Sequence, residues 1–419
     1  MMSGAKKIVP KRRFKEFLNA GDWEQRKLGS IGSTYTGLSG KTKEDFGHGE
    51  AQYITYLNVF QNTIADITMT DKVEIDTTQN EVKYGDVLFT TSSETPEEVG
   101  MSSVWLGDTP NIYLNSFCFG FRPNQKIDPY FLGYSLRASY MRDKIKILAQ
   151  GISRYNISKN KVMELEISLP NNEEQKLLGA FLQRIDLIIT LHQRKLDKLQ
   201  ATKKALLQEM FPEEGQDKPK RRFKGFTDAW EQRKLGSIGS TYTGLSGKTK
   251  EDFGHGEAKY ITYLNVFQNT ISNITMTDKV EIDPTQNEVK YGDVLFTTSS
   301  ETPEEVGMSS VWLGDTPNIY LNSFCFGFRP NQKIDSYFLG YSLRAPYMRD
   351  RIKILAQGIS RYNISKNKVM ELEISLPNNE EQKLLGTFLQ RIDLIITLHQ
   401  RKLDKLKNLK QAYLNEMFV

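Results

Sequence analysis

One long stretch of sequence is written twice in this chain. Residues 23–211 align with residues 230–418 at a constant offset of 207 positions and without a gap. Up to Leu199, only eight positions differ from their counterparts: 52, 65, 66, 77, 129, 139, 144 and 180. A period this long indicates a duplicated domain rather than the short repeat of a solenoid array. We therefore expect two copies of one fold related by an approximate two-fold axis.

The composition is that of an ordinary globular protein with more than one domain. The chain has 419 residues and a formal net charge of +5, which favours an anionic partner only mildly. No apolar run approaches the ~20 residues of a membrane span, and the N-terminus lacks the apolar core of a signal peptide. Two cysteines, Cys118 and Cys325, support neither a disulfide framework nor a metal cluster. We expect a cytoplasmic protein without a metal site.

The first part of each repeat predicts a mixture of strands and helices. Strand-like runs are "QYITYLNVF", "DVLFTT", "SSVWLG", "IYLNSFCFGF" and "ELEISLP". Asp128 followed by Pro129 predicts the start of one helix that continues to Leu148. Ser158 is the expected N-cap of a shorter helix. The fold class is therefore α+β, with two mixed domains.

The second part of each repeat predicts one long helix with a coiled-coil seam. No Gly or Pro interrupts the chain between Gly179 and Pro212, and apolar residues recur at alternating steps of three and four. Because a lone helix of this kind is marginal and a whole domain separates the two, we expect them to pack antiparallel. His192 and His399 fall on the seam, where we interpret them as polar register-setting residues. The predicted apolar seam is Leu182, Ile185, Ile189, Leu196, Leu199 and Leu206, with Leu389, Ile392, Ile396, Leu403, Leu406 and Tyr413.

Enzyme motifs are absent from the sequence. The stretch "TYTGLSGKTKEDFG" contains Gly-Lys-Thr, but Tyr35 stands where a phosphate-binding loop needs its first glycine. No dinucleotide, zinc-protease, hydrolase or amino-methyltransferase signature is found. We interpret the paired carboxylates Glu173 and Glu174 as helix-start residues. The basic clusters at residues 10–15 and 218–224 are interpreted as solvated linker, with phosphate contact as the alternative.

Three segments together resemble a known family. Each repeat opens with a form of "RRFKGFTDAWEQRKLGSI", continues with "QGISRYNISKNKVMELEISLPNNEEQKLLGAFL" and ends with "RIDLIITLHQRKLDKLQATKKALLQEMF" in the first copy. This pattern resembles the DNA-specificity subunit of type I restriction-modification systems over nearly the whole chain. The resemblance implies target-recognition domains at 1–170 and 221–377, a linker at 212–220, and conserved coiled-coil helices at 171–211 and 378–419. The departure is the near-identity of the two recognition domains, which commonly differ within one chain.

The resemblance implies a non-catalytic chain that selects a DNA sequence for its partners. In the family, two modification subunits dock on the paired helices and methylate adenine with S-adenosylmethionine. Two restriction subunits can join and cleave unmodified double-stranded DNA using ATP and Mg²⁺, so these cofactors are expected in the partners and none in this chain. Nearly identical domains related by two-fold symmetry predict a palindromic bipartite site. The alternatives are a stand-alone DNA-binding or scaffold protein and a duplicated nucleotide-binding enzyme.

Base-reading residues are predicted from loops that combine hydrogen-bond donors with positive charge, because arginine suits guanine, asparagine suits adenine and lysine more often meets phosphate. The alternative is a structural role, in which such turn residues form hydrogen bonds only with the neighbouring backbone. The candidates in the first repeat are Thr36, Lys41, Lys43, Tyr56, Asn58, Ser92, Ser93, Arg154, Tyr155 and Asn156. Their counterparts are Thr243, Lys248, Lys250, Tyr263, Asn265, Ser299, Ser300, Arg361, Tyr362 and Asn363.

Overall fold

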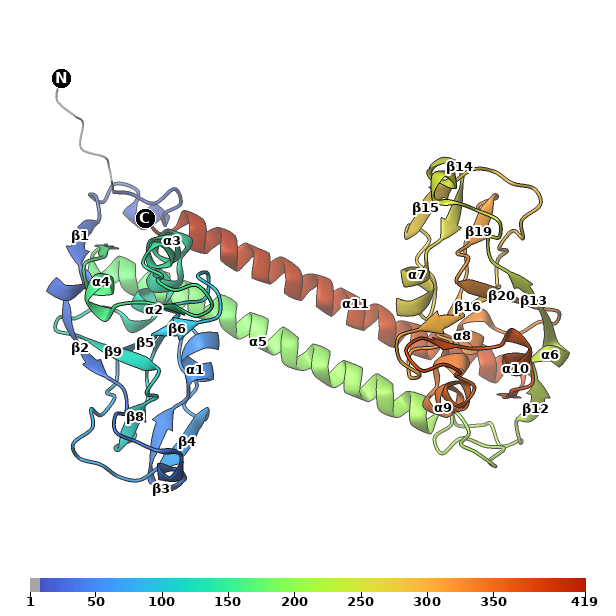
Figure 1. Ribbon diagram of the computed structural model, residues 1–419, viewed down its shortest axis with the longest axis horizontal. Coiled ribbons are helices and arrows are strands. Elements are labelled where there is room, and N and C mark those ends of the chain that lie inside the picture. The colour runs from blue at the N-terminus through green and yellow to red at the C-terminus, as the bar shows by residue number, and fades with distance from the viewer. Residues whose placement is uncertain (1–7) are drawn as a thin grey trace. The chain divides into compact units, whose positions relative to one another are not determined.

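The computed structural model describes residues 8–419 and divides into two compact units of equivalent composition (Figure 1). Unit 1 runs to Gln193 and also contains Arg401–Val419, and unit 2 is Arg194–Gln400. Each unit therefore combines one mixed domain with the first part of its own long helix and the last part of the other. The α+β prediction is confirmed.

Unit 1 is built on two small sheets and two short strand pairs. The four-stranded antiparallel sheet runs β2 (Gly32–Thr36), β9 (Cys118–Pro123), β5 (Val87–Thr90) and β7 (Ser102–Val104). The three-stranded sheet has β3 (Phe46–Ile54) between the antiparallel β4 (Thr70–Val73) and the parallel β8 (Ile112–Leu114). The two strand pairs are β1 (Glu24–Lys27) with β11 (Glu166–Leu169), and β6 (Ser92–Ser93) with β10 (Tyr155–Asn156).

The helix α2 of unit 1 begins at a side-chain cap, whereas Ser158 before α4 makes no side-chain cap hydrogen bond. The carboxylate of Asp128 accepts the backbone N–H of Phe131 at 2.8 Å, and Pro129 occupies the first turn of α2. The helices are α1 (Tyr56–Gln61), α2 (Pro129–Arg137), α3 (Ser139–Ile147), α4 (Lys159–Met163) and α5 (Asn172–Glu209), with one-turn 3₁₀ helices at Lys15–Phe17, Leu28–Ser30 and Lys43–Asp45.

Unit 2 repeats the same order of elements. Its sheets are β13 (Gly239–Thr243), β20 (Cys325–Pro330), β16 (Val294–Thr297) and β18 (Ser309–Val311), then β15 (Thr277–Val280), β14 (Phe253–Ile261) and β19 (Ile319–Leu321). Its strand pairs are β12 (Glu231–Lys234) with β22 (Glu373–Leu376), and β17 (Ser299–Ser300) with β21 (Tyr362–Asn363). Its helices are α6 (Leu235–Ile238), α7 (Tyr263–Gln268), α8 (Ser336–Arg344), α9 (Pro346–Ile354), α10 (Lys366–Met370) and α11 (Asn379–Glu416), with a 3₁₀ turn at Lys250–Asp252.

Two expectations about local structure were wrong. The helix predicted from Asp128 to Leu148 breaks at Ala138, whose backbone is extended (φ −65°, ψ 149°), so α2 and α3 are separate. The second copy carries Pro346 directly after this break, where a proline disfavours helical geometry in the preceding residue. The second half of the predicted strand "QYITYLNVF" is the helix α1, because the Thr55 hydroxyl caps it by accepting the N–H of Asn58.

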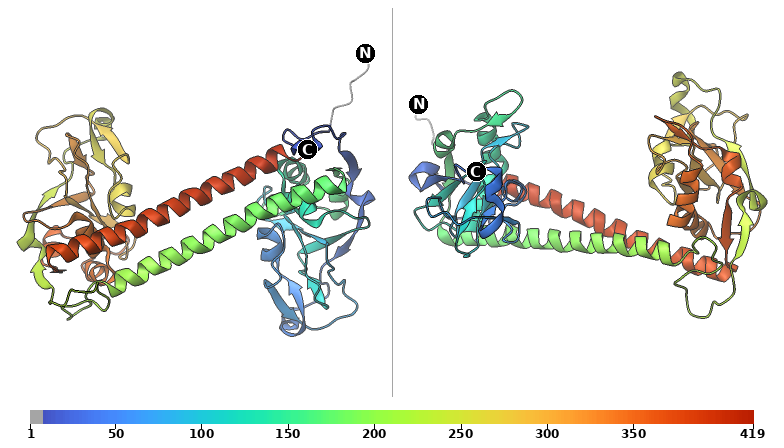
Figure 2. Two further views of the ribbon diagram at one scale, coloured as in Figure 1. Left: turned by 180° about the vertical axis from the view of Figure 1, so that it is seen from behind. Right: turned by 60° about the horizontal axis from the view of Figure 1, so that its bottom comes forward.

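The two long helices pack antiparallel within each unit. In unit 1, Phe181 of α5 meets Tyr413 of α11 with ring centroids 4.9 Å apart, and Asp186 lies 2.7 Å from the Lys410 ammonium. Both views of Figure 2 show the last turns of α11 beside the first turns of α5. Every predicted seam residue is buried or half-buried, whereas Leu187 and Leu191, between the seam positions, are exposed. This alternation of buried and exposed positions is the pattern that a coiled-coil seam requires.

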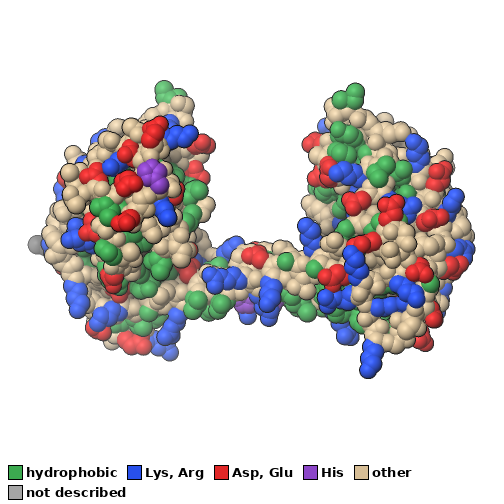
Figure 3. Space-filling view, turned by 90° about the horizontal axis from the view of Figure 1, so that it is seen from below, with side chains coloured by type: hydrophobic (Ala, Val, Ile, Leu, Met, Phe, Trp, Pro, Cys, Tyr) green, Lys and Arg blue, Asp and Glu red, His purple; other side chains and the backbone are tan. Residues whose placement is uncertain are grey.

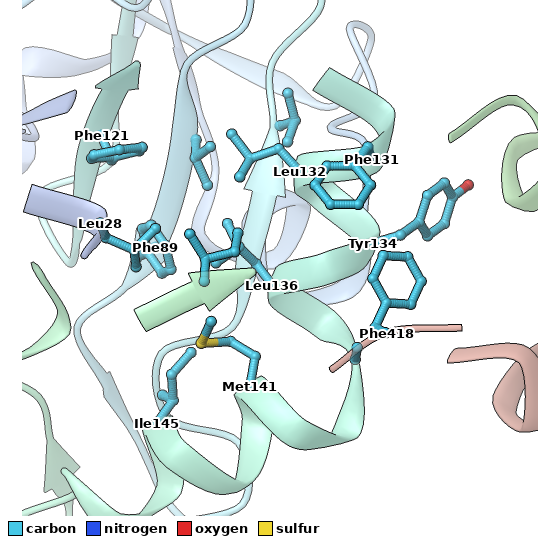
Figure 4. Packing of buried hydrophobic residues seen from close by; sticks show 14 of the residues in the cluster. Leu28, Phe89, Phe121, Phe131, Leu132, Tyr134, Leu136, Met141, Ile145 and Phe418 are labelled. Atoms are coloured by element: carbon cyan, nitrogen blue, oxygen red, sulfur yellow. The ribbon is translucent and has the colours of Figure 1, made fainter. Parts of the chain in front are cut away.

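The C-terminal end of the chain completes the hydrophobic core of unit 1. Phe418 packs against Phe131 with ring centroids 5.7 Å apart (Figure 4). The centroid of its ring also lies 6.4 Å from that of Trp23. Leu414 and Met417 are buried in the same cluster. The segment that follows α5 completes the core of unit 2 in the same way. The ring centroids of Phe211 and Trp230 are 6.2 Å apart, and both residues belong to the hydrophobic core of that unit. Each mixed domain therefore depends on a helix end contributed by the other repeat.

The basic cluster before each domain holds an ion pair rather than solvated linker alone. Arg13 donates two hydrogen bonds of 2.6 Å to Glu174 at the start of α5, with side chains only 4% and 1% exposed. Arg222 makes the same pair with Glu381 in unit 2. Glu174 is thus a buried anchor as well as a helix-start residue. The interpretation of these two arginines as solvated was wrong.

Candidate nucleic-acid interface

A pocket of about 500 Å³ in unit 1 collects four of the predicted base-reading residues. Its walls come from α1, from the strand β6 and the loop that follows it, and from the loop before β10. Tyr56, Ser92, Ser93 and Arg154 were predicted; Leu57, Phe60, Glu94, Glu98 and Ser153 complete the lining.

Strand pairing brings two of the predicted loops together. Tyr155 pairs with Ser93 and Asn156 with Ser92, so the loop segments at residues 90–95 and 151–156, which contain these candidates, form one short ladder. The hydroxyl of Tyr56 donates to the Ser92 carbonyl at 2.6 Å, which fixes α1 against this ladder. The phenol edge of Tyr56 is therefore occupied, and its ring stacks on Phe60 with centroids 6.0 Å apart.

Arg154 is the exposed cation of the pocket. Its guanidinium carbon lies 5.8 Å from the centre of the Phe117 ring, and that ring is itself more than half exposed. In unit 2, Arg361 lies over Phe324 at 5.7 Å in the same way. Phe117 was missed in the sequence because "IYLNSFCFGF" reads as one apolar strand, whereas the structure turns outward at Phe117 between β8 and β9.

Two half-buried arginines hold the walls of the pocket through backbone carbonyls. Arg137 at the end of α2 donates to the carbonyls of Val59, Phe60, Asn62 and Ser102 at 2.6–2.9 Å, and so ties down the end of α1. Burial lowers the pKa of Arg137 to about 9, so the guanidinium stays charged at neutral pH.

The second of these arginines, Arg142, fixes the loop on the other side of the pocket. It donates to the carbonyls of Glu97, Val99 and Gly100 at 2.7–2.9 Å. Because carbonyl acceptors carry no net charge, both arginines act as fixed multidentate clamps rather than as ion-pair partners. The sequence offered no signal for this role.

Some predicted residues are used inside the domain. Asn58 is fully buried, and its amide donates to the carbonyls of Asp66 and Met69 while its oxygen accepts the N–H of Asp66. Asn265 makes the equivalent contacts in unit 2. The Ser92 and Ser93 side chains are nearly buried, and the Ser93 hydroxyl donates to Glu98. These contacts fit the structural role that was the alternative to base reading for turn residues.

The Gly-Lys-Thr loop lies beside the three-stranded sheet and does not line the pocket. The Lys41 ammonium sits 2.8 Å from the Asp76 carboxylate, and this hydrogen bond holds the pKa of Asp76 well below its ordinary value. Lys248 and Asp283 repeat the pair. Thr36 and Lys43 are exposed, as are Thr243 and Lys250. The Tyr35 hydroxyl donates to Asp86 at 2.6 Å, so the residue in the glycine position of a phosphate loop is a fixed core contact.

A family profile described as "Type I restriction modification DNA specificity domain" matches residues 20–201 and again residues 227–408. The chain belongs to this specificity family.

Curated relatives in the specificity family are similar over most of their length. A putative type I restriction enzyme MjaX specificity subunit from Methanocaldococcus jannaschii is 25% identical over 421 residues, which covers 94% of this chain and 92% of that protein. The type I restriction enzyme MjaVIII specificity subunit from the same organism is 25% identical over 305 residues, or 70% of each chain.

Solved structures of the specificity family share the fold. The S subunit of a type I restriction-modification system from M. genitalium has a TM-score of 0.57 at 16% identity, covering 98% of this chain and 99% of that one. A chain from a type I system studied for its complex assembly and conformational transition has a TM-score of 0.57 at 18% identity, covering 94% and 96%. At these identities the likeness establishes the fold alone.

A network in each unit joins the recognition domain of this specificity-family chain to both long helices. In unit 1, Asp186 of α5 accepts the hydroxyl of Tyr134 at 2.8 Å and pairs with Lys410 of α11, whose ammonium also lies 5.4 Å from the centre of the Tyr134 ring. In unit 2, Asp393 does the same with Tyr341 and Lys203. Lys410 and Lys203 are accommodated in the apolar seam because each forms an ion pair with the aspartate of its unit.

The charge of the surface is mixed. On the face shown in Figure 3, Lys and Arg side chains are interspersed with Asp and Glu over both units. Within residues 8–419, no group of three or more His, Cys, Asp or Glu is placed to hold a metal ion, and no helix is long and apolar enough to cross a membrane.

Proposed function

We propose that this chain is the DNA-recognition subunit of a type I restriction-modification complex and contributes no catalytic group itself. The observation that carries the proposal is the family match to each repeat, taken together with a pocket that gathers exposed Arg154, serine backbone and aromatic rings at one ladder. Arginine, small polar groups and exposed rings are the chemistry by which proteins contact base edges.

The site is proposed to be bipartite and palindromic. The two domains differ at few positions, and each packs one helix start antiparallel against the end of the other helix. Identical reading surfaces on an antiparallel pair of helices present the same residues to opposite strands. The half-sites would then be inverted repeats separated by bases that are not read.

Catalysis is assigned to the partners. We place adenine methylation in two modification subunits that use S-adenosylmethionine, and ATP- and Mg²⁺-dependent cleavage in two restriction subunits. Support comes from the family match and from the failure of the Gly-Lys-Thr loop as a nucleotide site, since Lys41 is held by Asp76 and the loop leads into only one 3₁₀ turn.

Methylation mapping tests the proposal. The full chain is expressed with its modification subunit in a host that lacks other adenine methylation, and modified adenines are located by single-molecule sequencing. One motif with two inverted half-sites is expected. Two unrelated half-sites would refute the palindrome but keep the function. Failure of the chain to co-purify with the modification subunit, with no methylated motif, would favour the stand-alone DNA-binding alternative.

A further inference from the structure

The loop at residues 151–154 carries a large apolar side chain directed entirely into solvent. Ile152 is 95% exposed, and its counterpart Ile359 is 95% exposed. Single exposed apolar residues are common, but here others gather around the neighbouring Arg154. Phe117 lies under its guanidinium and Leu57 shares its pocket, and both are more than half exposed. The loop thus joins one cation to an apolar surface.

The loop is held in a fixed shape. Gln150 and Asn156 exchange two backbone hydrogen bonds of 2.9 and 2.8 Å at its base, and Ile157 donates to the Thr91 carbonyl at 3.0 Å. Gly151 has φ +139°, and a Cβ there would lie 2.0 Å from the carbonyl oxygen of Arg154. A glycine is required at this position. A rigid loop presents Ile152 at low entropic cost on binding.

The chemistry of the loop favours DNA over an apolar partner. The Arg154 guanidinium is exposed and lies over the Phe117 ring, so its charge is available to an anionic or carbonyl-rich ligand. In the major groove, the C5 methyl of thymine is the apolar group that side chains contact, and guanine offers a bidentate site for arginine. Ile152 and Arg154 are two residues apart, a reach of at most about 7 Å, or about two base-pair steps.

We propose that Ile152 and Ile359 are specificity-determining residues, each contacting the methyl group of a thymine within two base pairs of the position met by Arg154 or Arg361. This proposal rests on the proposed function. The thymine contact is a property of the loop tip and is separable from the family assignment.

The test replaces thymine by deoxyuracil, which lacks only the methyl group. Duplexes containing the mapped site are bound to the complex of the full chain with its modification subunits, with uracil at each thymine of the half-sites in turn. Loss of one buried methyl contact predicts about 4-fold weaker binding for one half-site and about 15-fold for both. The same duplexes are then bound to the complex carrying Ile152→Ala and Ile359→Ala.

In the variant complex the thymine and uracil duplexes should bind equally, because the contacting side chain is gone. Ile147→Ala with Ile354→Ala is the matched control, since these isoleucines are 82% and 81% exposed at the ends of α3 and α9. This control should keep the full preference for thymine.

Three outcomes overturn the proposal. They are a mapped half-site without thymine, thymine–uracil discrimination that survives in the variant carrying Ile152→Ala and Ile359→Ala, and equal binding of both duplexes by the wild-type complex together with weaker binding of both by the variant. The last would indicate an apolar wedge between base steps instead. Failure of the proposed function gives a different result, because the wild-type complex would then neither select nor methylate any bipartite site.

Discussion

Replacing Phe418 by alanine should destabilise unit 1, although the residue lies at the far end of the chain from the domain it supports. Phe418 is 4% exposed and packs on Phe131 and Trp23. Truncating a buried phenylalanine to alanine costs about 3–5 kcal/mol. Because Phe418 follows the end of α11 and its neighbours can relax, the lower figure applies, and ~3 kcal/mol is roughly a hundredfold change in the opening equilibrium of unit 1.

Hydrogen exchange read by mass spectrometry can assign this effect to one unit. Peptides covering 129–147 and 336–354 differ at three positions, Pro129/Ser336, Ser139/Pro346 and Lys144/Arg351, so their masses are distinct. Phe418→Ala should accelerate exchange in peptide 129–147 and leave peptide 336–354 unchanged.

The mirror variant Phe211→Ala is the control. Phe211 packs on Trp230 and Phe338 in unit 2, so exchange should accelerate in peptide 336–354 only. The reasoning fails if Phe418→Ala accelerates peptide 336–354 as well, or if both variants give the same pattern. Either result would mean that Phe418 and Phe211 do not separately stabilise the cores of unit 1 and unit 2.

Two further predictions concern the pocket wall and a surface histidine. Arg137→Met should leave the carbonyls of Val59, Phe60 and Asn62 without a donor, at a cost of about 3 kcal/mol. Hydrogen exchange in peptide 52–66 should therefore rise in this variant, whereas the control Arg184→Met, on the exposed face of α5, should leave it unchanged. Equal exchange of this peptide in both variants would contradict the clamping role of Arg137. The Glu44 carbonyl, and after it the Glu74 carboxylate, raise the pKa of His48 above its ordinary value. The stabilisation is therefore complete below about pH 6.5 and is lost as pH rises through the folded pKa. Because His255 repeats these contacts, Glu74→Gln with Glu281→Gln should lower the histidine pKa in an NMR titration, and an unchanged midpoint would exclude the carboxylate as a cause.

The features predictable from the sequence are those written in local periodicity. The spacing of leucines and isoleucines in α5 and α11 predicted the seam because a helical face repeats every few residues whatever lies opposite. Asp128 with Pro129 predicted the start of α2 for the same reason, since a cap acts within one turn. The end of that helix was missed in the first copy, where Ser139 gives no stop signal. Pro346 in the second copy carried the signal.

The features that were not predictable depend on partners distant in sequence. Arg13 and Glu174 are 161 residues apart, and nothing near Arg13 distinguishes it from the other arginine and lysines of its cluster. Asn58 looked like a base-reading residue because an amide suits adenine, yet the same amide satisfies the carbonyls of Asp66 and Met69 in a turn. Residue type alone does not separate these roles. Burial decides between them.

The positions at which the two repeats differ bear on whether they read the same half-site. None of the eight falls in the loop 150–156, in β6 or in α1, so Ile152, Arg154 and Phe117 have identical counterparts. Two differences alter charge, since Gln52 becomes Lys259 and Asp66 becomes Asn273, and both make unit 2 more positive. Gln52 lies on β3, and Asp66 lies in the loop between α1 and β4. Charge at such positions acts on phosphate without regard to base sequence. The divergence between the repeats is therefore compatible with unequal electrostatic attraction, while base reading stays symmetric.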